Sequence, residues 1–146
     1  MAMQPLPHHY LVGVAGTMAG PLTVGASGLP DMVCNAPREF GGPGDRWSPE
    51  SLFVAALACC FILTFRAVAL ASKIEWSRLE CSTTGTLERI DGVTQFSRVS
   101  TVATLSIRSN ADTILCERAL EKAERECLVA NSLRAHRELQ VQIVRV

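Results

Sequence analysis

The pattern of apolar and polar residues divides the chain into short strand patterns, two helix patterns and longer strand patterns. Segments rich in β-branched and apolar residues, at positions 10–16, 21–27 and 29–34, are separated by glycine and proline. Such punctuation marks turns between short strands, so we expect a small antiparallel sheet at the start of the chain. A glycine-rich loop at 38–47 follows it.

A nearly uninterrupted apolar run at 52–65 predicts the first helix. The run follows Ser48, Pro49 and Glu50, which suit a helix start as a cap, a first helical residue and an acid near the positive helix end. We expect this helix to reach about Ser72. Because its apolar residues surround the whole helix, one chain of this size is not expected to bury it. The pattern therefore predicts an obligate homodimer with this helix at its centre.

The second half of the chain predicts two long strands, a helix and a final strand. The strands, at 75–89 and 95–109, are joined through Asp91-Gly92, a dipeptide that tolerates a hairpin turn. The helix begins near Asn110, a good cap, with Asp112 in its first turn. The last strand is expected at 138–146. One helix face carries apolar residues at helical spacing, and these are Cys116, Leu120, Ala123 and Cys127. Cys127 is therefore expected to point inward.

These elements follow the order β-β-β-α-β-β-α-β, which is an α+β arrangement, and we expect a single domain over 1–146. Fourteen basic residues balance fourteen acidic ones. Without an excess of positive charge, nucleic acid is not an expected partner. The N-terminal segment lacks the pattern of a signal peptide, and the apolar run is short for a membrane span. We therefore predict a cytoplasmic protein with no membrane partner.

The six cysteines raise the question of packing, disulfide, metal or redox chemistry. A reducing compartment argues against a disulfide scaffold, and without a C-x-x-C pair we expect no metal and no cofactor. Free cysteine is commonly a packing residue, and we interpret Cys59 in this way. Cys59 and Cys60 are adjacent in a helix, so their side chains point about 100° apart and do not share one small site.

Two segments of the sequence indicate that Cys60 and Cys127 have a role beyond packing. The segment SPESLFVAALACCF, residues 48–61, resembles the first signature of the OsmC/Ohr family, in which a Pro-Glu helix start precedes a cysteine by ten residues. Glu50 and Cys60 keep this spacing. The segment ECLVANSL, residues 126–133, resembles the second signature, with Cys127 at the end of the last helix. The resemblance implies an OsmC-like fold, an intertwined α+β homodimer with a buried central helix.

The resemblance also implies a function, namely a cysteine-based peroxidase that reduces organic hydroperoxides. Cys60 would be the thiolate that attacks the peroxide, and Cys127 the resolving thiol that closes a disulfide. A dithiol reductant of the lipoyl or thioredoxin type would restore the pair. Glu50 would orient a cation at the thiolate, although about 15 Å of helix separates it from Cys60.

The chain departs from the family pattern at the cation. Peroxidase members carry an arginine in the N-terminal sheet, whereas residues 14–24 contain no basic residue here. Arg38 and Arg46, in or beside the glycine-rich loop, are the candidate replacements. The departure leaves a second hypothesis open, in which the protein is a non-catalytic carrier or sensor of a small apolar or thiol-bearing ligand. A purely structural dimer with inert cysteines is a third.

Overall fold

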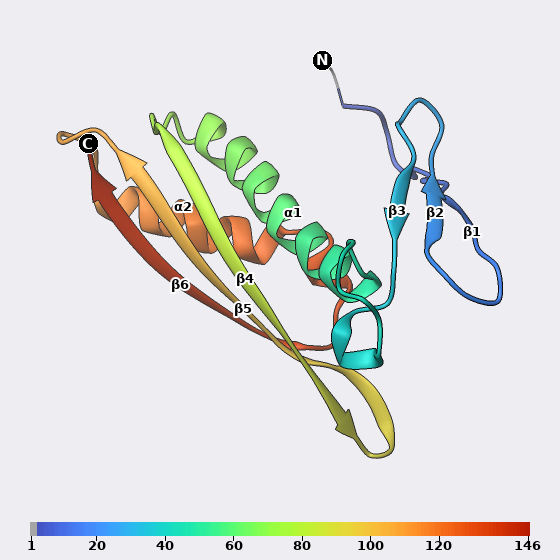
Figure 1. The fold of residues 1–146 in the computed structure, drawn as a ribbon. Helices are drawn as coiled ribbons and strands as arrows, with labels where there is room; N and C mark the ends of the chain where they lie inside the picture. Colours follow the sequence, from blue (N-terminus) through green and yellow to red (C-terminus); the bar gives the residue numbers. More distant parts are fainter. Residues whose placement is uncertain (1–2) are drawn as a thin grey trace. The chain divides into compact units, whose positions relative to one another are not determined.

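A computed structural model describes residues 3–146, and Figure 1 shows the course of the chain. Within these residues the strands and helices follow the order β-β-β-α-β-β-α-β, which confirms the predicted α+β class. The chain divides into two compact units, with the boundary between Leu52 and Phe53. The single domain expected from the chain length stays a prediction, and the two units are described in turn.

The N-terminal unit contains a small antiparallel sheet in the order β1-β2-β3. Its strands are shorter than the predicted segments and comprise β1 (Gly13–Ala15), β2 (Leu22–Gly25) and β3 (Met32–Cys34). Gly20 and Gly28 have positive φ angles of 89° and 77°, which end the strands in turns. After the short helix η1 (Arg38–Phe40), Trp47 bridges back to Cys34.

Helix α1 (Pro49–Ala71) begins where its cap predicts. The Ser48 hydroxyl accepts a hydrogen bond from the backbone N–H of Ser51 at 3.1 Å, and the Ser51 hydroxyl accepts from the N–H of Ser48 at 2.9 Å. Each serine thus satisfies an amide that the helix leaves free, as in a capping box. The structure confirms the helix start at Ser48.

The C-terminal unit contains a second sheet, in the order β4-β5-β6. Strands β4 (Arg78–Ile90) and β5 (Val93–Ile107) form the predicted hairpin. Asp91 and Gly92 both have positive φ angles, 49° and 79°, as their turn requires. Strand β6 (His136–Arg145) pairs with β5 in parallel, with Leu139, Val141 and Ile143 on its core side as expected.

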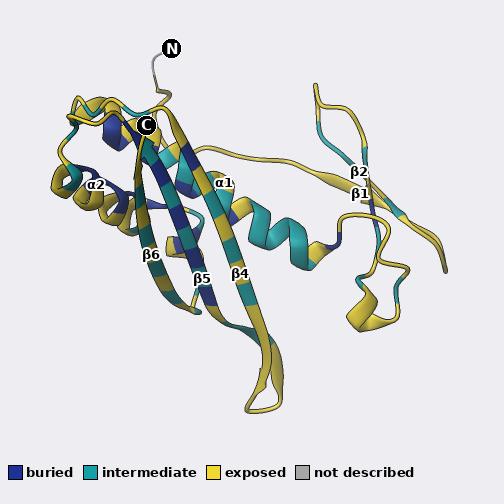
Figure 2. Cartoon of the chain, turned by 60° about the vertical axis from the view of Figure 1, so that its left-hand side comes forward, coloured by how far each residue is buried: buried dark blue, intermediate teal, exposed yellow. Residues whose placement is uncertain are grey.

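Helix α2 (Thr113–Glu126) connects β5 to β6, and in Figures 1 and 2 it lies on the same side of the sheet as α1. Its cap is Asp112, whose carboxylate accepts from the N–H groups of Ile114 and Leu115, and not Asn110 as predicted. The carboxylate reaches two free amides from this position. The predicted apolar face is confirmed, because Cys116, Leu120, Ala123 and Cys127 are all buried.

Helix α1 buries only one face within its own chain. That face packs against the sheet and comprises Leu57, Phe61, Phe65, Val68 and Ala69. Leu63 and Leu70, on the other side, are 58% and 82% exposed. The single chain therefore leaves part of α1 uncovered, as the sequence predicts for one chain of this size. By length and composition alone α1 could also span a membrane, so the absence of a membrane partner stays a prediction.

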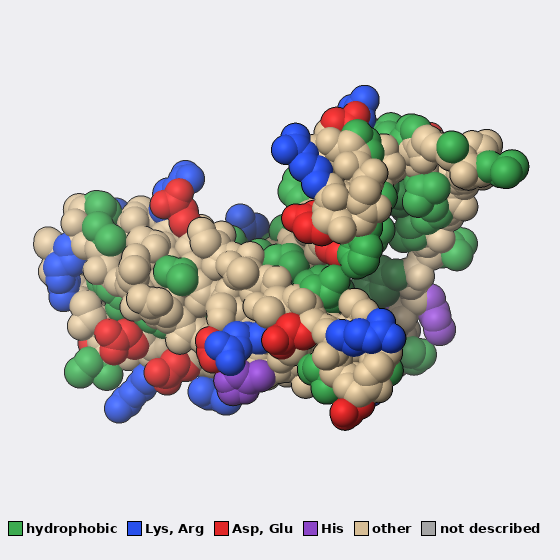
Figure 3. Space-filling view, turned by 60° about the horizontal axis from the view of Figure 1, so that its bottom comes forward, with side chains coloured by type: hydrophobic (Ala, Val, Ile, Leu, Met, Phe, Trp, Pro, Cys, Tyr) green, Lys and Arg blue, Asp and Glu red, His purple; other side chains and the backbone are tan. Residues whose placement is uncertain are grey.

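Charged side chains are mixed by sign on the surface that Figure 3 presents, where Lys and Arg lie among Asp and Glu. This distribution agrees with the equal numbers of acidic and basic residues in the sequence. A phosphate backbone binds to surfaces with clustered positive charge. The surface in view does not have that character.

Candidate functional site

The structure brings Cys60 and Cys127 together in the C-terminal unit. Cys60 lies in the middle of α1 and is half-buried, whereas Cys127 follows the last turn of α2 and is 1% exposed. Both belong to a small hydrophobic cluster built around Leu57, Val99 and Ala130. We call it the thiol cluster. Two residues far apart in sequence thus share one apolar environment.

Cys127 is held as a protonated thiol. Burial raises its pKa to about 11. The backbone N–H of Ala130 donates to the sulfur and opposes this rise, while the neighbouring Cys60 thiol and the Glu124 carboxylate add to it. Near neutral pH Cys127 therefore carries its proton and is unreactive until a step removes that proton.

Cys60 has a polar partner on its own helix. The hydroxyl oxygen of Thr64 lies 3.9 Å from the Cys60 sulfur, and the same hydroxyl donates to the Cys60 carbonyl at 2.7 Å. The two residues are four positions apart and therefore share one helix face. Sequence reasoning missed Thr64, although this spacing from Cys60 was available as a signal.

A polar network ties the Cys127 turn to β6. Glu124 forms a 3.2 Å ion pair with Arg137, which also donates to the side-chain oxygen of Asn131 at 3.0 Å. Asn131 in turn donates to the carbonyl of Arg125 at 3.1 Å. Burial raises the pKa of Glu124, and Arg137 opposes that rise. The network spans the short helix η2 (Ala130–Ser132) and fixes the segment that follows Cys127.

Glu50 lies in the first turn of α1, well before Cys60 on the same helix. Its Oε2 atom is buried and has no hydrogen-bond partner among residues 3–146. Buried polar atoms are nearly always paired, so this carboxylate is atypical. Its expected role in orienting a cation stays a prediction.

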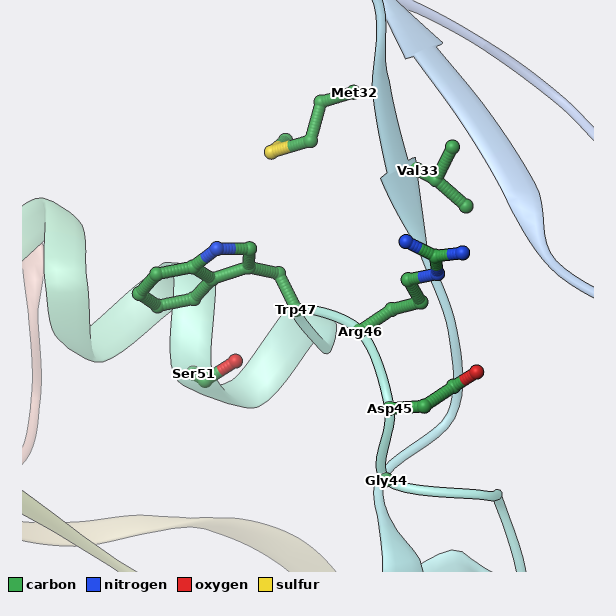
Figure 4. Close-up of a pocket in the computed structure, with 7 residues that line it drawn as sticks. All are labelled: Met32, Val33, Gly44, Asp45, Arg46, Trp47 and Ser51. Atoms are coloured by element: carbon green, nitrogen blue, oxygen red, sulfur yellow. The ribbon is translucent and has the colours of Figure 1, made fainter.

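Arg38 and Arg46 belong to the N-terminal unit and both are exposed. The side chain of Arg38 occupies the space beside Gly44, where a Cβ would collide with it. Arg46 lines an open pocket of about 600 Å³ that also includes Met32, Trp47 and residues shown in Figure 4. In that view the guanidinium of Arg46 and the ring of Trp47 point in different directions. That either arginine serves the thiols stays a prediction.

The other cysteines divide between buried and exposed positions. Cys34 and Cys116 are buried, which is typical of packing residues, and burial raises the pKa of half-buried Cys81 to about 11. Cys59 is exposed, so its interpretation as a packing residue is wrong within this chain. The turn of 100° per residue points Cys59 away from the face that carries Cys60. Across residues 3–146, no three metal-binding side chains gather at one point.

Comparison with known proteins gives consistent matches. The family model of the OsmC-like proteins matches residues 42–142. The uncharacterised protein YmaD of Bacillus subtilis is 26% identical over 109 residues, which are 73% of each chain. The organic hydroperoxide resistance protein of Xanthomonas axonopodis pv. citri is 46% identical over 46 residues, 31% of this chain and 32% of that protein.

A solved structure extends the match to the fold. An OsmC-like protein of unknown function from Vibrio cholerae superimposes with a TM-score of 0.83 at 18% identity, covering 92% of this chain and 99% of its own. At this identity the likeness concerns the fold alone. The matched family model spans more than half of the sequence and includes both cysteines of the thiol cluster. The chain belongs to the OsmC/Ohr family.

Proposed function

We propose that this protein is a thiol peroxidase that reduces organic hydroperoxides. A role in peroxide resistance is supported by its family and by the Xanthomonas relative named an organic hydroperoxide resistance protein. The observation that carries the peroxidase mechanism is the contact of two free thiols, Cys60 and Cys127, in one apolar cluster.

The reaction uses the two thiols in sequence. The Cys60 thiolate attacks one oxygen of the peroxide, so an S–O bond forms, the O–O bond breaks and the alkoxide leaves, taking up a proton as the alcohol. Cys60 is now a sulfenic acid. The Cys127 sulfur attacks it as its proton is removed, so an S–S bond forms and the hydroxyl leaves as water. A dithiol then reduces the disulfide by exchange and becomes oxidised itself.

The burial of each thiol suits its role. Half-buried Cys60 is the thiol that a peroxide can reach, whereas fully buried Cys127 keeps its proton until a sulfenic acid forms beside it. The rings of Phe53 and Phe96 stack with their centroids 4.7 Å apart, and Phe53 packs against the thiol cluster. This aromatic pair provides an apolar surface suited to the organic group of a hydroperoxide.

The protein is further proposed to act as a homodimer in the cytoplasm, with a lipoyl or thioredoxin type of dithiol as its reductant. Support for the dimer comes from the apolar side of α1 that its own chain leaves exposed, including Leu63 and Leu70. Patches of this kind are typical of interaction surfaces. A stable monomer at micromolar concentration in light scattering would count against the dimer.

The test is consumption of cumene hydroperoxide with dihydrolipoamide as reductant. Cys60→Ser is expected to lose turnover by at least about a thousandfold, because the attacking sulfur is gone. Cys81→Ser is the matched control, since Cys81 is also a half-buried free thiol, and it should retain turnover. Equal turnover in wild type and Cys60→Ser overturns the proposal. An inactive wild type that is thermally stabilised by an apolar ligand favours a carrier instead.

A further inference from the structure

We propose that the hydroxyl of Thr64 is the hydrogen-bond partner of the Cys60 sulfur, accepting from the thiol and donating to the thiolate. The inference deepens the proposed function, because it assigns a stabilising group to the sulfur on which that function rests. It concerns a residue of α1 itself and so involves only the C-terminal unit. The pair is joined by the 3.9 Å contact between the Thr64 Oγ1 and Cys60 Sγ atoms.

A hydroxyl can serve both protonation states because it is a donor and an acceptor at once. With Cys60 protonated, the Thr64 O–H donates to the Cys60 carbonyl at 2.7 Å, which leaves a lone pair of the same oxygen for the S–H group. When the thiol loses its proton, rotation about the Cβ–Oγ bond turns the O–H towards the sulfur. The hydroxyl then exchanges a bond to a neutral carbonyl for a bond to a charged sulfur, and bonds to charged groups are the stronger of the two.

The apolar surroundings of Thr64 strengthen this hydrogen bond. Thr64 is half-buried, and its neighbours one turn before and one turn after it on the helix, Phe61 and Val68, are buried in the core. Electrostatic interactions are stronger where water is excluded, and hydrogen bonds to charged groups are stronger than those between neutral groups. The Thr64 hydroxyl is therefore placed to donate to a thiolate at Cys60.

Thr64 also completes a chain of polar contacts through both thiols. Its hydroxyl meets the Cys60 sulfur, that sulfur lies beside Cys127, and the Cys127 sulfur receives the N–H of Ala130. Two charged groups lie at the Cys127 end, namely Glu124 on α2, which acts on Cys127, and Arg137 on β6, which pairs with Glu124. Thr64 thus supplies an uncharged donor at the Cys60 end. The N-terminal sheet contains no lysine or arginine, because the first arginine of the sequence is Arg38.

The test measures alkylation of Cys60 by iodoacetamide against pH in the full-length reduced protein. Cys59 is first changed to serine, so that the peptide carrying Cys60 has one reactive thiol and mass spectrometry reports Cys60 alone. In this background Thr64→Val removes the hydroxyl and keeps the branched shape, and Thr64→Ser keeps the hydroxyl. Circular dichroism and thermal unfolding check that each variant folds.

Thr64→Val is expected to move the midpoint of the Cys60 alkylation profile upward by about one pH unit, with a rate near neutral pH about tenfold lower. Thr64→Ser is expected to keep the wild-type midpoint. An unchanged midpoint in Thr64→Val overturns the proposal, as does the same shift in both variants, because loss of packing and not of the hydroxyl would then be the cause. Alkylation needs no peroxide. An unchanged alkylation profile would therefore overturn the role of Thr64 alone, whereas a wild type that does not consume peroxide would overturn the proposed peroxidase function.

Discussion

The C-terminal unit contains two hydrophobic clusters along α1, and each includes two cysteines. The larger cluster, which we call the main core, contains Cys116 in its interior and Cys81 packed at its edge. The thiol cluster contains Cys127 in its interior and Cys60 packed at its edge. In both clusters burial raises the pKa of a cysteine to about 11, Cys81 in the first and Cys127 in the second. Burial and apolar surroundings therefore do not separate the two pairs.

What separates them is their polar contacts. Cys60 raises the pKa of Cys127 beyond the effect of burial, so the two sulfurs of the thiol cluster are neighbours. The Cys60 sulfur has Thr64 as a polar partner, and the Cys127 sulfur has the N–H of Ala130. Cys81 has its pKa raised by burial alone. Burial raises the pKa of Cys116, the Asp112 and Glu117 carboxylates raise it further, and Arg145 opposes the rise. Redox chemistry between two thiols requires contact, so under the proposed function the thiol cluster is the one expected to react.

The largest effect is expected from a cavity in the main core. Leu120→Ala removes a fully buried side chain and should lower the free energy of unfolding by about 2–5 kcal/mol, measured by urea denaturation. Leu128→Ala, at a side chain that is 71% exposed, is the control and should change it by about 0.5 kcal/mol or less. Similar losses in the two variants would show that Leu120 does not anchor the core.

The matched pair Cys127→Ser and Cys116→Ser should distinguish the clusters directly, since each removes a cysteine that is 1% exposed. Cys127→Ser is expected to reduce peroxide turnover by about tenfold or more, because the sulfenic acid then lacks its neighbouring thiol. Cys116→Ser should keep turnover and lose about 1–3 kcal/mol of stability, because it buries a hydroxyl. If Cys116→Ser lowers turnover as much as Cys127→Ser, the distinction between the clusters fails.

A smaller effect is expected at Gly85 on β4, where the aromatic pair closes over the backbone. A Cβ at Gly85 would lie 2.8 Å from both the Phe96 ring and the Val54 side chain. Gly85→Ala should therefore displace the Phe53–Phe96 stack and cost about 1–3 kcal/mol in denaturant unfolding. Gly13→Ala, which meets open space, is its control. A stable Gly85→Ala with unchanged tertiary packing would mean that the aromatic pair adapts.

A pH-dependent effect concerns alkaline stability. Cys81 and Cys127 have pKa values near 11 in the folded protein against an ordinary value of 9.0, so between these values the unfolded state has lost protons that the folded state retains. The contribution of both thiols to the free energy of unfolding is therefore fully present below about pH 9 and is lost as pH rises towards 11. Thermal unfolding across this range should show the fall, and Cys81→Ala should reduce it. A stability that is flat from pH 9 to 11 would contradict the burial of these thiols.

The parts of the fold predicted from sequence are those that neighbouring residues determine. The Ser48 cap, the Asp91-Gly92 turn and the buried face of α2 each depend on local spacing, and the structure agrees with all three. The cap of α2 was misplaced at Asn110 because asparagine and aspartate both suit that position, and only the backbone shows that Asp112 receives the amides.

The parts that sequence reasoning missed depend on tertiary packing. Arg137 reaches Glu124 and Asn131 because β6 pairs in parallel with β5 and returns past the end of α2. No local sequence pattern predicts the register of this strand pair. Thr64 is a different case, because its contact with the Cys60 sulfur is local and follows from their four-residue spacing in the helix.

The most direct test of the central claim is the identity of the disulfide that peroxide produces. Reduced protein is treated with one equivalent of cumene hydroperoxide and digested without reductant, and fragment masses distinguish Cys60 from its neighbour Cys59. The account predicts a single major disulfide that joins Cys60 to Cys127, the two thiols of one cluster. A product in which Cys60 and Cys127 remain reduced, or in which peroxide links Cys59 or Cys116 instead, would contradict it.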